Sequence, residues 1–287
     1  YRRFWPADGC ICKKIRKNNG YQILILSDNG GKFDMKKLHV TCGIVTYNNA
    51  DIIEKCIGTL LEYTKGCSIR IYVYDNHSSD GTVELIQKKF KQVRIIAKKS
   101  NKGFGYGHNR ILQSLPQADY HIVVNPDIMV DTDVVTQMAE YMEANKNIGI
   151  LIPKVLNTDG TEQFLPKYQP NFKYVIMSKF KHWKYYRDIY TRKNDQIKEP
   201  VKCENISGSF FMIRRSLVEE LQGFDERYFM YFEDADLARR ANQKTDLVYN
   251  PNVYVYHAWK RDNTGNIRGI CIFLKSMLKY ALKWKGF

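Results

Sequence analysis

Residues 38–49 read LHVTCGIVTYNN, an apolar run that stops at polar side chains. An apolar run of this length that ends at Thr46–Asn49 predicts a strand buried on both faces. The following residues carry apolar side chains at helical spacing from Ala50 to Tyr63, with Asn49 as the expected N-cap. A buried strand followed at once by a helix is the repeating unit of a parallel sheet, because parallel neighbours need a long crossover connection.

The same alternation continues through the first half of the chain. Further strands are expected at Ile69–Tyr74, Val93–Ala97, Tyr120–Val124 and Ile148–Ile152. Helices are expected at Val83–Phe90, at Ile111–Leu115 after a turn at Gly103–Gly107, and at Val134–Glu143. Strands that alternate with helices predict an α/β fold, with a mixed but mainly parallel sheet covered by helices on both faces.

The second half of the chain is less regular. Residues 164–202 are rich in Tyr, Phe, Lys and Trp without a clear period, and we interpret them as a basic insertion or flexible loop. Order returns with a strand at Ile206–Ile213, a helix near Leu217, an acidic helix that begins at Glu233 and a strand at Val253–Tyr256. We therefore expect a main domain over residues 35–263 and a C-terminal helix within 264–287. Residues 1–34 are either an upstream extension or a genuine N-terminal element.

The net charge of +15 comes from 45 basic and 30 acidic residues, and it is unevenly distributed. Residues 1–38 hold nine basic and three acidic side chains, residues 167–202 hold ten and three, and residues 260–287 hold seven and one. The remainder therefore has 19 basic against 23 acidic side chains. A slightly acidic remainder, outside these three basic segments, argues against a nucleic-acid-binding protein, because phosphates need a basic surface.

Cysteine use and hydrophobic runs exclude two further classes of protein. The seven Cys are odd in number and form no Cys-x-x-Cys pair, so the sequence predicts neither a disulfide framework nor a zinc ribbon, and it favours a reducing cytosol. No apolar run approaches the ~20 residues that span a bilayer. In Ile270–Trp284, lysines recur every four residues at positions 275, 279 and 283. This basic amphipathic helix either lies on an anionic membrane surface or packs on its own domain with solvated lysines.

Polar side chains follow three of the expected strands at the point where each strand ends. They are Thr46-Tyr47-Asn48, Asp75-Asn76 and Asn125-Pro126-Asp127. In an open α/β sheet, ligands bind beyond the carboxyl ends of the strands. Carboxylates there can bind a base or ribose, or hold a divalent cation. Each group taken singly could merely cap the next helix, but three together favour a binding site.

A second acidic cluster lies at Glu233-Asp234-Ala235-Asp236. An aromatic run at residues 228–232 is expected to bury the base of this cluster, and burial raises a carboxyl pKa toward the range of a general base. The alternative is a favourable interaction of these carboxylates with the helix dipole, with Arg239 and Arg240 as ion-pair partners. His257 follows the last expected strand, where it is either a metal or phosphate contact or a structural residue.

Together these residues resemble family 2 glycosyltransferases with the GT-A fold. The resemblance rests on the strand-end groups above and on further motifs in the same order. These are Asp75-Asn76-x-Ser78-x-Asp80-Gly81-Thr82, Asn101-x-Gly103-Phe104-Gly105, Gly208-Ser209-Phe210-Phe211, Gly223-Phe224-Asp225-Glu226-x-x-Phe229 and Glu233-Asp234-x-Asp236-Leu237-x-x-Arg240. The Asn-Pro-Asp sequence and the motif at 101–105 are most similar to the rhamnosyltransferase-like branch. The glycines at 103–107 lack the spacing of a dinucleotide-binding loop.

The resemblance implies an inverting enzyme that moves a sugar from a nucleotide-diphosphate donor to a hydroxyl of a glycan acceptor. We expect L-rhamnose from dTDP-rhamnose first, with a UDP-hexose or UDP-N-acetylhexosamine donor, or an inactive sugar-nucleotide-binding relative, as alternatives. The acceptor is expected to be polyprenyl-linked, which would place the protein peripherally on the inner face of a bacterial membrane. The Gln-x-x-Arg-Trp motif of processive synthases is absent from the sequence, so the resemblance implies single additions.

The resemblance also assigns roles to individual residues. Asp234 would be the catalytic base, with Glu233 as the second candidate, and Asp127 with His257 would hold Mg²⁺ or Mn²⁺. Asp75 would bind the pyrimidine base of the donor. Arg240 would support either the diphosphate or the acidic helix. The remaining donor-binding positions are Thr46, Tyr47, Asn48, Asn76, Asn101, Gly103, Phe104 and Asn125, of which Asn125 replaces the first Asp of an Asp-x-Asp motif.

Overall fold

A computed structural model describes residues 11–17, 20–26, 37–114, 118–177, 184–258 and 267–285. The chain divides into two compact units, residues 1–37 and residues 38–287. In the first unit, β1 (Ile11–Lys17) and β2 (Gly20–Leu26) form an antiparallel hairpin. The sequence pattern does not predict this hairpin, because neither strand alternates cleanly between apolar and polar side chains.

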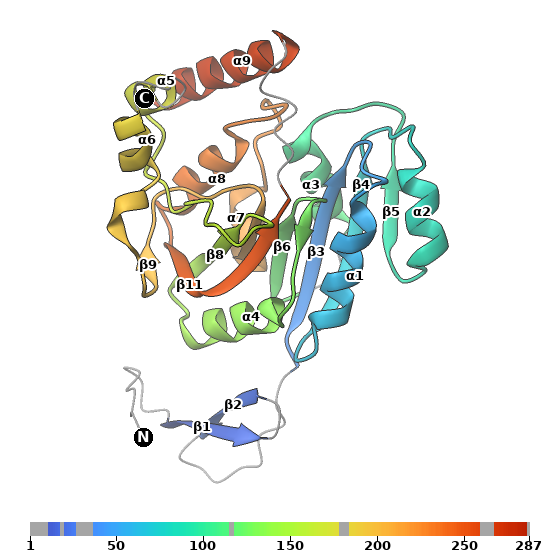
Figure 1. The fold of residues 1–287 in the computed structure, drawn as a ribbon, viewed down its shortest axis with the longest axis vertical. Helices are drawn as coiled ribbons and strands as arrows, with labels where there is room; N and C mark the ends of the chain where they lie inside the picture. Colours follow the sequence, from blue (N-terminus) through green and yellow to red (C-terminus); the bar gives the residue numbers. More distant parts are fainter. Residues whose placement is uncertain are drawn as a thin grey trace. The chain divides into compact units, whose positions relative to one another are not determined.

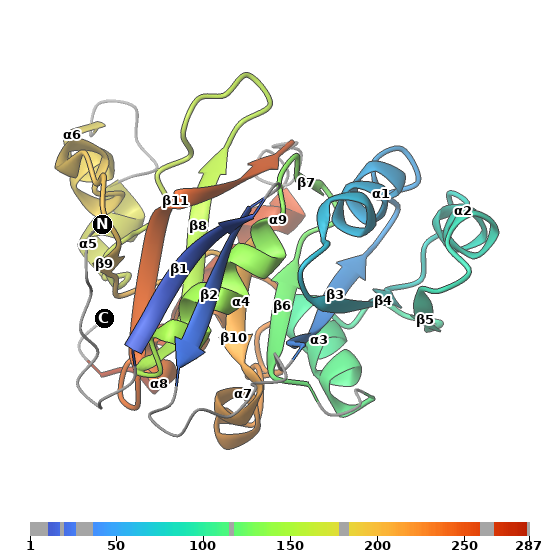
Figure 2. The ribbon, with the colours of Figure 1, turned by 90° about the horizontal axis from the view of Figure 1, so that it is seen from below.

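The second unit is built on a nine-stranded sheet whose path runs β5-β4-β3-β6-β10-β8-β11-β7, with β9 paired to β11 (Figure 2). Its strands, in chain order, are β3 (His39–Thr46), β4 (Ser68–Asp75), β5 (Arg94–Ala97), β6 (Tyr120–Val124), β7 (Ile128–Met129), β8 (Ile148–Leu156), β9 (Val201–Lys202), β10 (Phe210–Arg214) and β11 (Asp246–His257). Strands β3 to β6 pair in parallel, as do β8 and β11, whereas β10 runs antiparallel between β6 and β8. The prediction of a mixed, mainly parallel sheet is confirmed.

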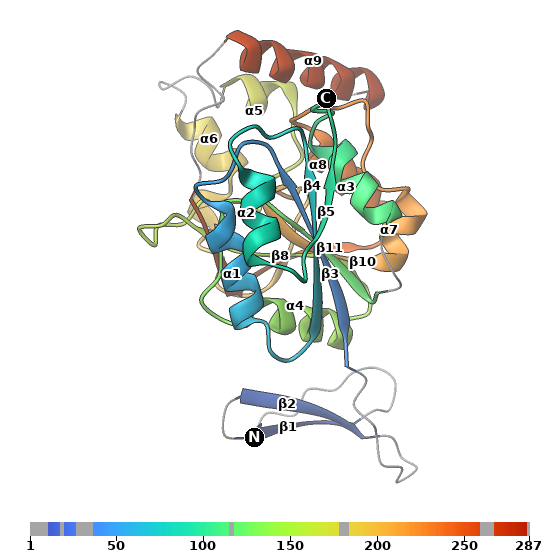
Figure 3. The same cartoon turned by 90° about the vertical axis from the view of Figure 1, so that its right-hand side faces the viewer.

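Helices cover both faces of this sheet (Figure 3). On one face lie α1 (Ile53–Tyr63), α2 (Thr82–Lys89) and α4 (Val134–Ala144), and on the other lie α3 (Phe104–Gln113), α7 (Arg215–Leu221) and α8 (Glu233–Ala241). Strand β6 shows how one apolar run serves both layers. Ile122 and Val124 join the core with α1, α2 and α4, while Val123 joins the core with α3, α7 and α8. This alternation follows from the two-residue period of a strand.

Two helix boundaries differ from the sequence-based expectation. Helix α1 begins at Ile53 with Ile52 as its N-cap, so the prediction of Asn49 as N-cap is wrong. The Asn49 side chain instead accepts hydrogen bonds from the Tyr47 amide and the Thr46 hydroxyl. Helix α3 begins directly after Gly103 and not near Ile111, because the glycines of this stretch are helical and pack closely against neighbouring strands and loops.

The described part of the 164–202 segment is ordered. It contains α5 (Phe172–Met177), α6 (Lys184–Tyr190) and a 3-10 turn at Lys193–Asp195. The interpretation of this segment as a flexible loop is therefore wrong for the described residues. Its aromatic side chains pack on one another, as the stacked rings of Tyr174 and Tyr190 show, with centroids 5.8 Å apart. Packing of this kind does not depend on a regular hydrophobic period, so periodicity could not reveal it.

The C-terminal helix α9 (Ile267–Lys283) packs on the same unit, near α5 and α8 (Figure 1). Tyr280 is fully buried in this contact. Of the three lysines spaced by four, Lys275 and Lys279 are exposed as expected, and Lys279 donates to the carbonyl of Arg227, but Lys283 turns inward and pairs with two carboxylates. Among the described residues, no helix combines the length and apolar character needed to cross a membrane.

Candidate active site

The polar strand ends gather at one edge of the sheet. In the parallel pairing of β3 with β4, Thr46 lies opposite Asp75, and in that of β3 with β6, Ile44 lies opposite Val124. The residues that follow these strands therefore emerge side by side. Because β10 is antiparallel to β6 and begins opposite Val124, the residues before it reach the same edge. The amide of Asn125 donates to the carbonyl of Ser209 over 2.8 Å, which joins the two segments directly.

Asp75 is held in place by its own loop. Its Oδ2 accepts hydrogen bonds from the backbone amides of His77 and Ser78, both at 3.0 Å. The residue is 2% exposed, and its Oδ1 has no hydrogen-bond partner among the described residues. A buried acceptor without a donor is costly in free energy. This oxygen is therefore available to an N–H donor of a ligand, and a pyrimidine base carries such a group.

Several other expected donor-binding residues use their polar groups within the protein. Thr46 is buried and its hydroxyl donates to Asn49, while the Asn48 oxygen accepts the amide of Ser79 at 2.9 Å. The Asn76 side chain donates to the carbonyl of Gly103 at 3.3 Å and accepts from the Lys102 amide at 3.0 Å. These side chains shape the edge of the sheet. The ring of Tyr47, at 51% exposure, remains available for stacking on a ligand.

The turn at Asn101–Phe104 connects the sheet edge to the segment before α8. Asn101 accepts the amide of Gly103 at 3.0 Å, and the amide of Phe104 donates to the carbonyl of Phe229 at 3.0 Å. Gly103 has φ +96°, and a Cβ at this position would lie 2.1 Å from the Phe229 oxygen. Only glycine fits this approach, so the turn is fixed against the aromatic run of residues 228–232.

Asp127 and His257 meet at the same edge because β7 pairs with the end of β11. Ile128 lies opposite His257 in this pairing, and the Nε2 of His257 lies 3.2 Å from the Oδ1 of Asp127. The Nδ1 of His257 faces the Oε1 of Gln163 at 3.0 Å. The Gln163 amide nitrogen donates to Asn157 and to the His257 carbonyl, so its oxygen is the atom that faces the ring.

This arrangement has a chemical consequence for the pair. When Nδ1 donates to Gln163, a neutral imidazole turns the lone pair of Nε2 toward the carboxylate of Asp127. Two acceptor atoms so close together suit a shared cation, and an outer hydrogen bond that orients a ligating histidine is typical of metal sites. No group of three His, Cys, Asp or Glu able to hold a metal occurs among the described residues. A cation here would therefore complete its shell with ligand or water oxygens.

The two candidate bases differ in accessibility. Glu233 is buried, and its Oε2 has no hydrogen-bond partner among the described residues. Asp234 is partly exposed and accepts two backbone amides, from Gly208 at 3.0 Å and from Ala235 at 2.8 Å. Burial raises the pKa of both carboxyl groups, and the charge of Asp234 raises that of Glu233 further. Asp234 is therefore the carboxylate that a substrate can reach.

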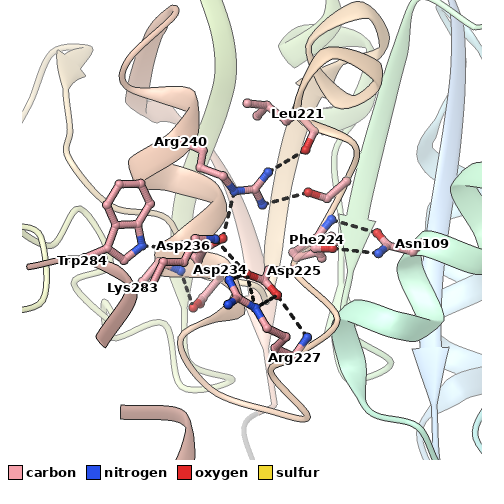
Figure 4. A network of polar contacts seen from close by, with 12 residues as sticks. Asn109, Leu221, Phe224, Asp225, Arg227, Asp234, Asp236, Arg240, Lys283 and Trp284 are labelled. Carbon is pink, nitrogen blue, oxygen red and sulfur yellow. Dashed lines mark hydrogen bonds and ion pairs between the residues drawn. The ribbon is translucent and has the colours of Figure 1, made fainter. Parts of the chain in front are cut away.

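Arg240 takes the second of its two expected roles (Figure 4). Its Nε donates to the buried Asp236 at 2.9 Å, and its two terminal nitrogens donate to the carbonyls of Leu221 and Gly223 at 2.7 and 2.8 Å. All three guanidinium nitrogens thus have partners within the protein. The expectation that Arg240 contacts the diphosphate of the donor has no geometric support, since the side chain is used to fix α8.

Four residues of the site were not expected from the sequence. Gln163 orients His257, and the amide of Gly208 binds Asp234. The charge of Lys167 lowers the pKa of Asp234 against the larger effect of burial, and Tyr190 lies close enough for the charge of Asp234 to raise the tyrosine pKa after burial. Gly208 belongs to a recognisable motif. The other three lie where the sequence shows no period, and no sequence signal marks them.

Residues 41–222 match the family described as Glycosyl transferase family 2. An N-acetylglucosaminyl-diphospho-decaprenol L-rhamnosyltransferase of Mycobacterium tuberculosis is 28% identical over 237 residues, which are 77% of this chain and 76% of the relative. Rhamnosyltransferase WbbL of Escherichia coli K12 is 26% identical over 254 residues, which are 84% of this chain and 91% of the relative.

Solved structures agree on the fold. The mannosyltransferase PcManGT from Pyrobaculum calidifontis, in complex with GDP-Man and Mn²⁺, has a TM-score of 0.61 at 15% identity over 88% of this chain and 67% of its own. GalNAc-T7, with UDP, GalNAc and Mn²⁺, has a TM-score of 0.62 at 15% identity over 88% of this chain and 49% of its own. These neighbours confirm the expected GT-A fold. With a matching family over residues 41–222 and two rhamnosyltransferases among its relatives, the chain belongs to glycosyl transferase family 2.

Proposed function

We propose that this protein transfers L-rhamnose from dTDP-rhamnose to a hydroxyl group of a polyprenyl-linked glycan in the synthesis of a bacterial surface polysaccharide. The names of the two rhamnosyltransferase relatives support the sugar, and the decaprenol of the mycobacterial relative supports the lipid carrier. One observation carries the proposal. The same sheet edge presents a buried unpaired oxygen of Asp75, the facing pair Asp127 and His257, and the reachable carboxylate of Asp234. Asp75 suits the pyrimidine of the donor, the pair Asp127 and His257 suits a cation on its diphosphate, and Asp234 suits the attacking hydroxyl of the acceptor.

The chemistry follows from these groups. Asp234 takes the proton of the acceptor hydroxyl while the hydroxyl oxygen forms a bond to the anomeric carbon of the sugar. The bond between that carbon and the diphosphate oxygen breaks on the opposite side, so the configuration inverts and the nucleoside diphosphate leaves with the electron pair. The raised pKa of Asp234 makes it a stronger base than an exposed aspartate. The backbone amide of Gly208 holds its carboxylate in place.

Asp127 and His257 fit a divalent cation, Mg²⁺ or Mn²⁺, through one carboxylate oxygen and one imidazole nitrogen. The Mn²⁺ bound by both structural neighbours supports this assignment. Such an ion, when bound, neutralises charge on the diphosphate of the donor and of the leaving group. Gln163 serves the site by keeping the Nε2 of His257 free of a proton.

The proposal includes a membrane surface, and α9 supports it in a different way from the one expected. Its outward side carries a row of apolar side chains that are between 46% and 82% exposed, namely Ile267, Ile270, Leu274, Leu278 and Leu282. Their spacing of three and four residues places them on one side of the helix. The exposed Arg268 and Lys275 lie beside this row. Apolar side chains next to basic ones suit the boundary between acyl chains and anionic headgroups.

A thermal-shift screen against dTDP-, UDP- and GDP-sugars, each with Mg²⁺, Mn²⁺ or chelator, tests the proposal, because a ligand of the native state raises its stability. We expect the largest shift with dTDP-rhamnose and metal, and transfer of rhamnose to a polyprenyl-diphosphate glycan. A larger shift and transfer with a UDP-sugar would move the donor to a hexose or N-acetylhexosamine. Binding without transfer would indicate an inactive relative. In Asp127→Ala, the metal-dependent part of the shift should be lost.

Vesicle flotation tests the membrane surface. The double variant Leu274→Gln and Leu278→Gln should float less with vesicles that contain phosphatidylglycerol than the native protein does. Substitution is preferable to truncation of α9, because the opposite side of this helix packs on α8. A surface variant away from the helix, such as Glu84→Gln, is the control. Equal flotation of the double variant and the control would contradict the membrane assignment.

A further inference from the structure

The segment directly before α8 has an unusual backbone. Tyr231 has φ 72° and Phe232 has φ 69°, so two consecutive bulky residues occupy the left-handed region that normally suits glycine. Phe232 is also the N-cap of α8, and no side chain caps the helix there. Each residue in this conformation is strained and persists only where its surroundings hold it. The next two residues are Glu233 and Asp234, so this turn determines where the candidate base lies.

Helix α9 supplies the contacts that hold this turn. The hydroxyl of Ser276, which is 2% exposed, donates to the carbonyl of Met230 over 2.8 Å. The ring of Phe273 lies 5.7 Å from that of Tyr231 and 5.5 Å from that of Phe232. The ring of Tyr280 lies 5.3 Å from that of Phe232. The two left-handed residues are therefore enclosed by side chains of one helix that lies distant in the sequence.

The C-terminal end of α9 and the residue that follows it also hold α8 at Asp236, two residues after Asp234 (Figure 4). Asp236 is fully buried, and its Oδ1 lies 2.6 Å from the Nζ of Lys283 and accepts the indole N–H of Trp284 at 2.9 Å. Its Oδ2 accepts from Arg240 at 2.9 Å. Hydrogen bonds to a buried charge are worth more than neutral ones, and breaking one is correspondingly costly. Asp236 thus fixes the first turn of α8 between the end of α9 and Arg240.

We propose that Ser276 and Lys283 of α9 and Trp284 directly after it are positioning residues for the catalytic base, an inference that rests on the proposed role of Asp234. They hold the backbone at Met230, three residues before Glu233, and the side chain of Asp236, two residues after Asp234, so they fix the base from both directions. None of them touches the strand ends at which the donor is expected to bind. Loss of one contact should therefore lower the rate of the chemical step without weakening donor binding.

Ser276→Ala tests this inference, with Ser114→Ala as a matched control. Both variants remove a serine hydroxyl that donates to a backbone carbonyl at 2.8 Å, but Ser114 donates to Arg110 at the end of α3. In Ser276→Ala we expect kcat to fall about tenfold with donor KM unchanged, because small displacements of a reacting group cost up to about 10²-fold in rate. The control should change neither constant, and Ser276→Thr should recover much of the rate.

Hydrogen exchange supplies a readout that does not require turnover. The amide of Gly208 donates to Asp234, so its exchange rate reports whether the carboxylate stays in place. It should rise several-fold in Ser276→Ala and in Trp284→Phe, which keeps an aromatic ring but loses the N–H, and should stay unchanged in Ser114→Ala. Unchanged exchange and kcat in both α9 variants would overturn the inference. A native protein without transferase activity would overturn the proposed function, while the exchange comparison would still decide the positioning role.

Discussion

The proposed site has two halves, a donor half around Asp75 and Asn101 and a base half around Asp234. Key residues of the two halves are held by different kinds of contact. In the donor half, Asp75 is fixed by amides two and three residues away, and Asn101 by an amide two residues away. In the base half, the corresponding bonds join residues 26, 46 and 48 positions apart, from Gly208 to Asp234, Ser276 to Met230 and Trp284 to Asp236. Asp75 and the turn at Asn101 are thus fixed within their own loops, whereas the segment around Asp234 depends on elements brought together by the tertiary fold.

The largest predicted effect is a loss of kcat in Asp234→Asn, which separates catalysis in the base half from donor binding in the donor half. Asp234→Asn keeps the shape of the base and removes its capacity to accept a proton, so kcat should fall by about 10²–10⁴-fold. Calorimetric binding of the donor with metal should change less than twofold, because no donor-half residue is altered. Transfer near the native rate in this variant would contradict the assignment of the base. Equal losses in kcat and in donor affinity would mean that the two halves are not separable.

Asp75→Asn tests the donor half in the same way. The unpaired Oδ1 is expected to accept an N–H of the pyrimidine, and a hydrogen bond to a charged group is worth about 1.5–3 kcal/mol, or roughly 10–150-fold in affinity. Titration calorimetry should therefore show weaker binding of dTDP-rhamnose and of dTDP alone. Binding of Mn²⁺ should be unchanged, since Asp127 and His257 are untouched. If dTDP binds this variant with native affinity, Asp75 does not contact the pyrimidine.

Gln163→Leu tests the contact between Gln163 and His257, one of the two proposed metal ligands. Without its oxygen, the Nδ1 of His257 loses its acceptor, and the tautomer that turns Nε2 toward Asp127 is no longer favoured. Loss of such an outer contact typically lowers metal affinity by about 10–100-fold. The Mn²⁺ concentration for half-maximal activity should rise accordingly, while kcat at saturating Mn²⁺ stays near native. A fall in kcat without a change in metal dependence would place Gln163 outside the metal site.

The same contrast explains what the sequence could and could not predict. Asp75, Asn76 and Asn125–Asp127 follow apolar runs, so a strand pattern alone identifies the edge at which they lie. The mainly parallel sheet follows from the same pattern. By contrast, β7 has two residues and β9 has two, which is too short for any periodic signal. Pairing between β7 and β11 is what brings Asp127 to His257, and it depends on the completed sheet.

The base half was only partly predictable for a related reason. Three carboxylates beside an aromatic run indicate a buried acidic cluster, and burial does raise the pKa of Glu233 and Asp234. Several partners that fix this cluster come from α9 and from Trp284 directly after it. The lysine spacing of this helix suggested a stripe facing outward, yet Lys283 points inward to Asp225 and Asp236. Periodicity shows which residues share a side of a helix, but it does not show which side is buried.

A buried pair of histidines makes the stability of the protein depend on pH. His108 of α3 and His121 of β6 are fully buried near Gly43 of β3, and burial lowers both pKa values, that of His121 to about 3. Between that pH and about 6.5, the unfolded chain binds more protons than the folded one, so stability falls as pH falls, by about 1.4 kcal/mol per pH unit for each proton. Urea unfolding from pH 7 to pH 5 should show this slope. His121→Gln should flatten it, and an unchanged slope would contradict burial as the cause.

Glu233 should contribute a pH dependence of the opposite sign. Because the pKa of Glu233 is raised above its usual 4.5, the folded state binds more protons than the unfolded chain above that pH, and stability falls as pH rises. Gln at position 233 does not titrate. The stability of Glu233→Gln relative to the native protein should therefore increase as pH rises above 4.5.

Glu84→Gln is the control for this measurement, because Glu84 is exposed on α2 and its replacement should leave the pH profile unchanged. If both variants follow the same profile, burial of Glu233 imposes no cost at neutral pH. A difference confined to Glu233→Gln would show that the fold holds this carboxylate at the expense of stability. A cost of that kind, next to a strained turn and a reachable Asp234, is expected where the chemistry of a site and not its packing determines the residue.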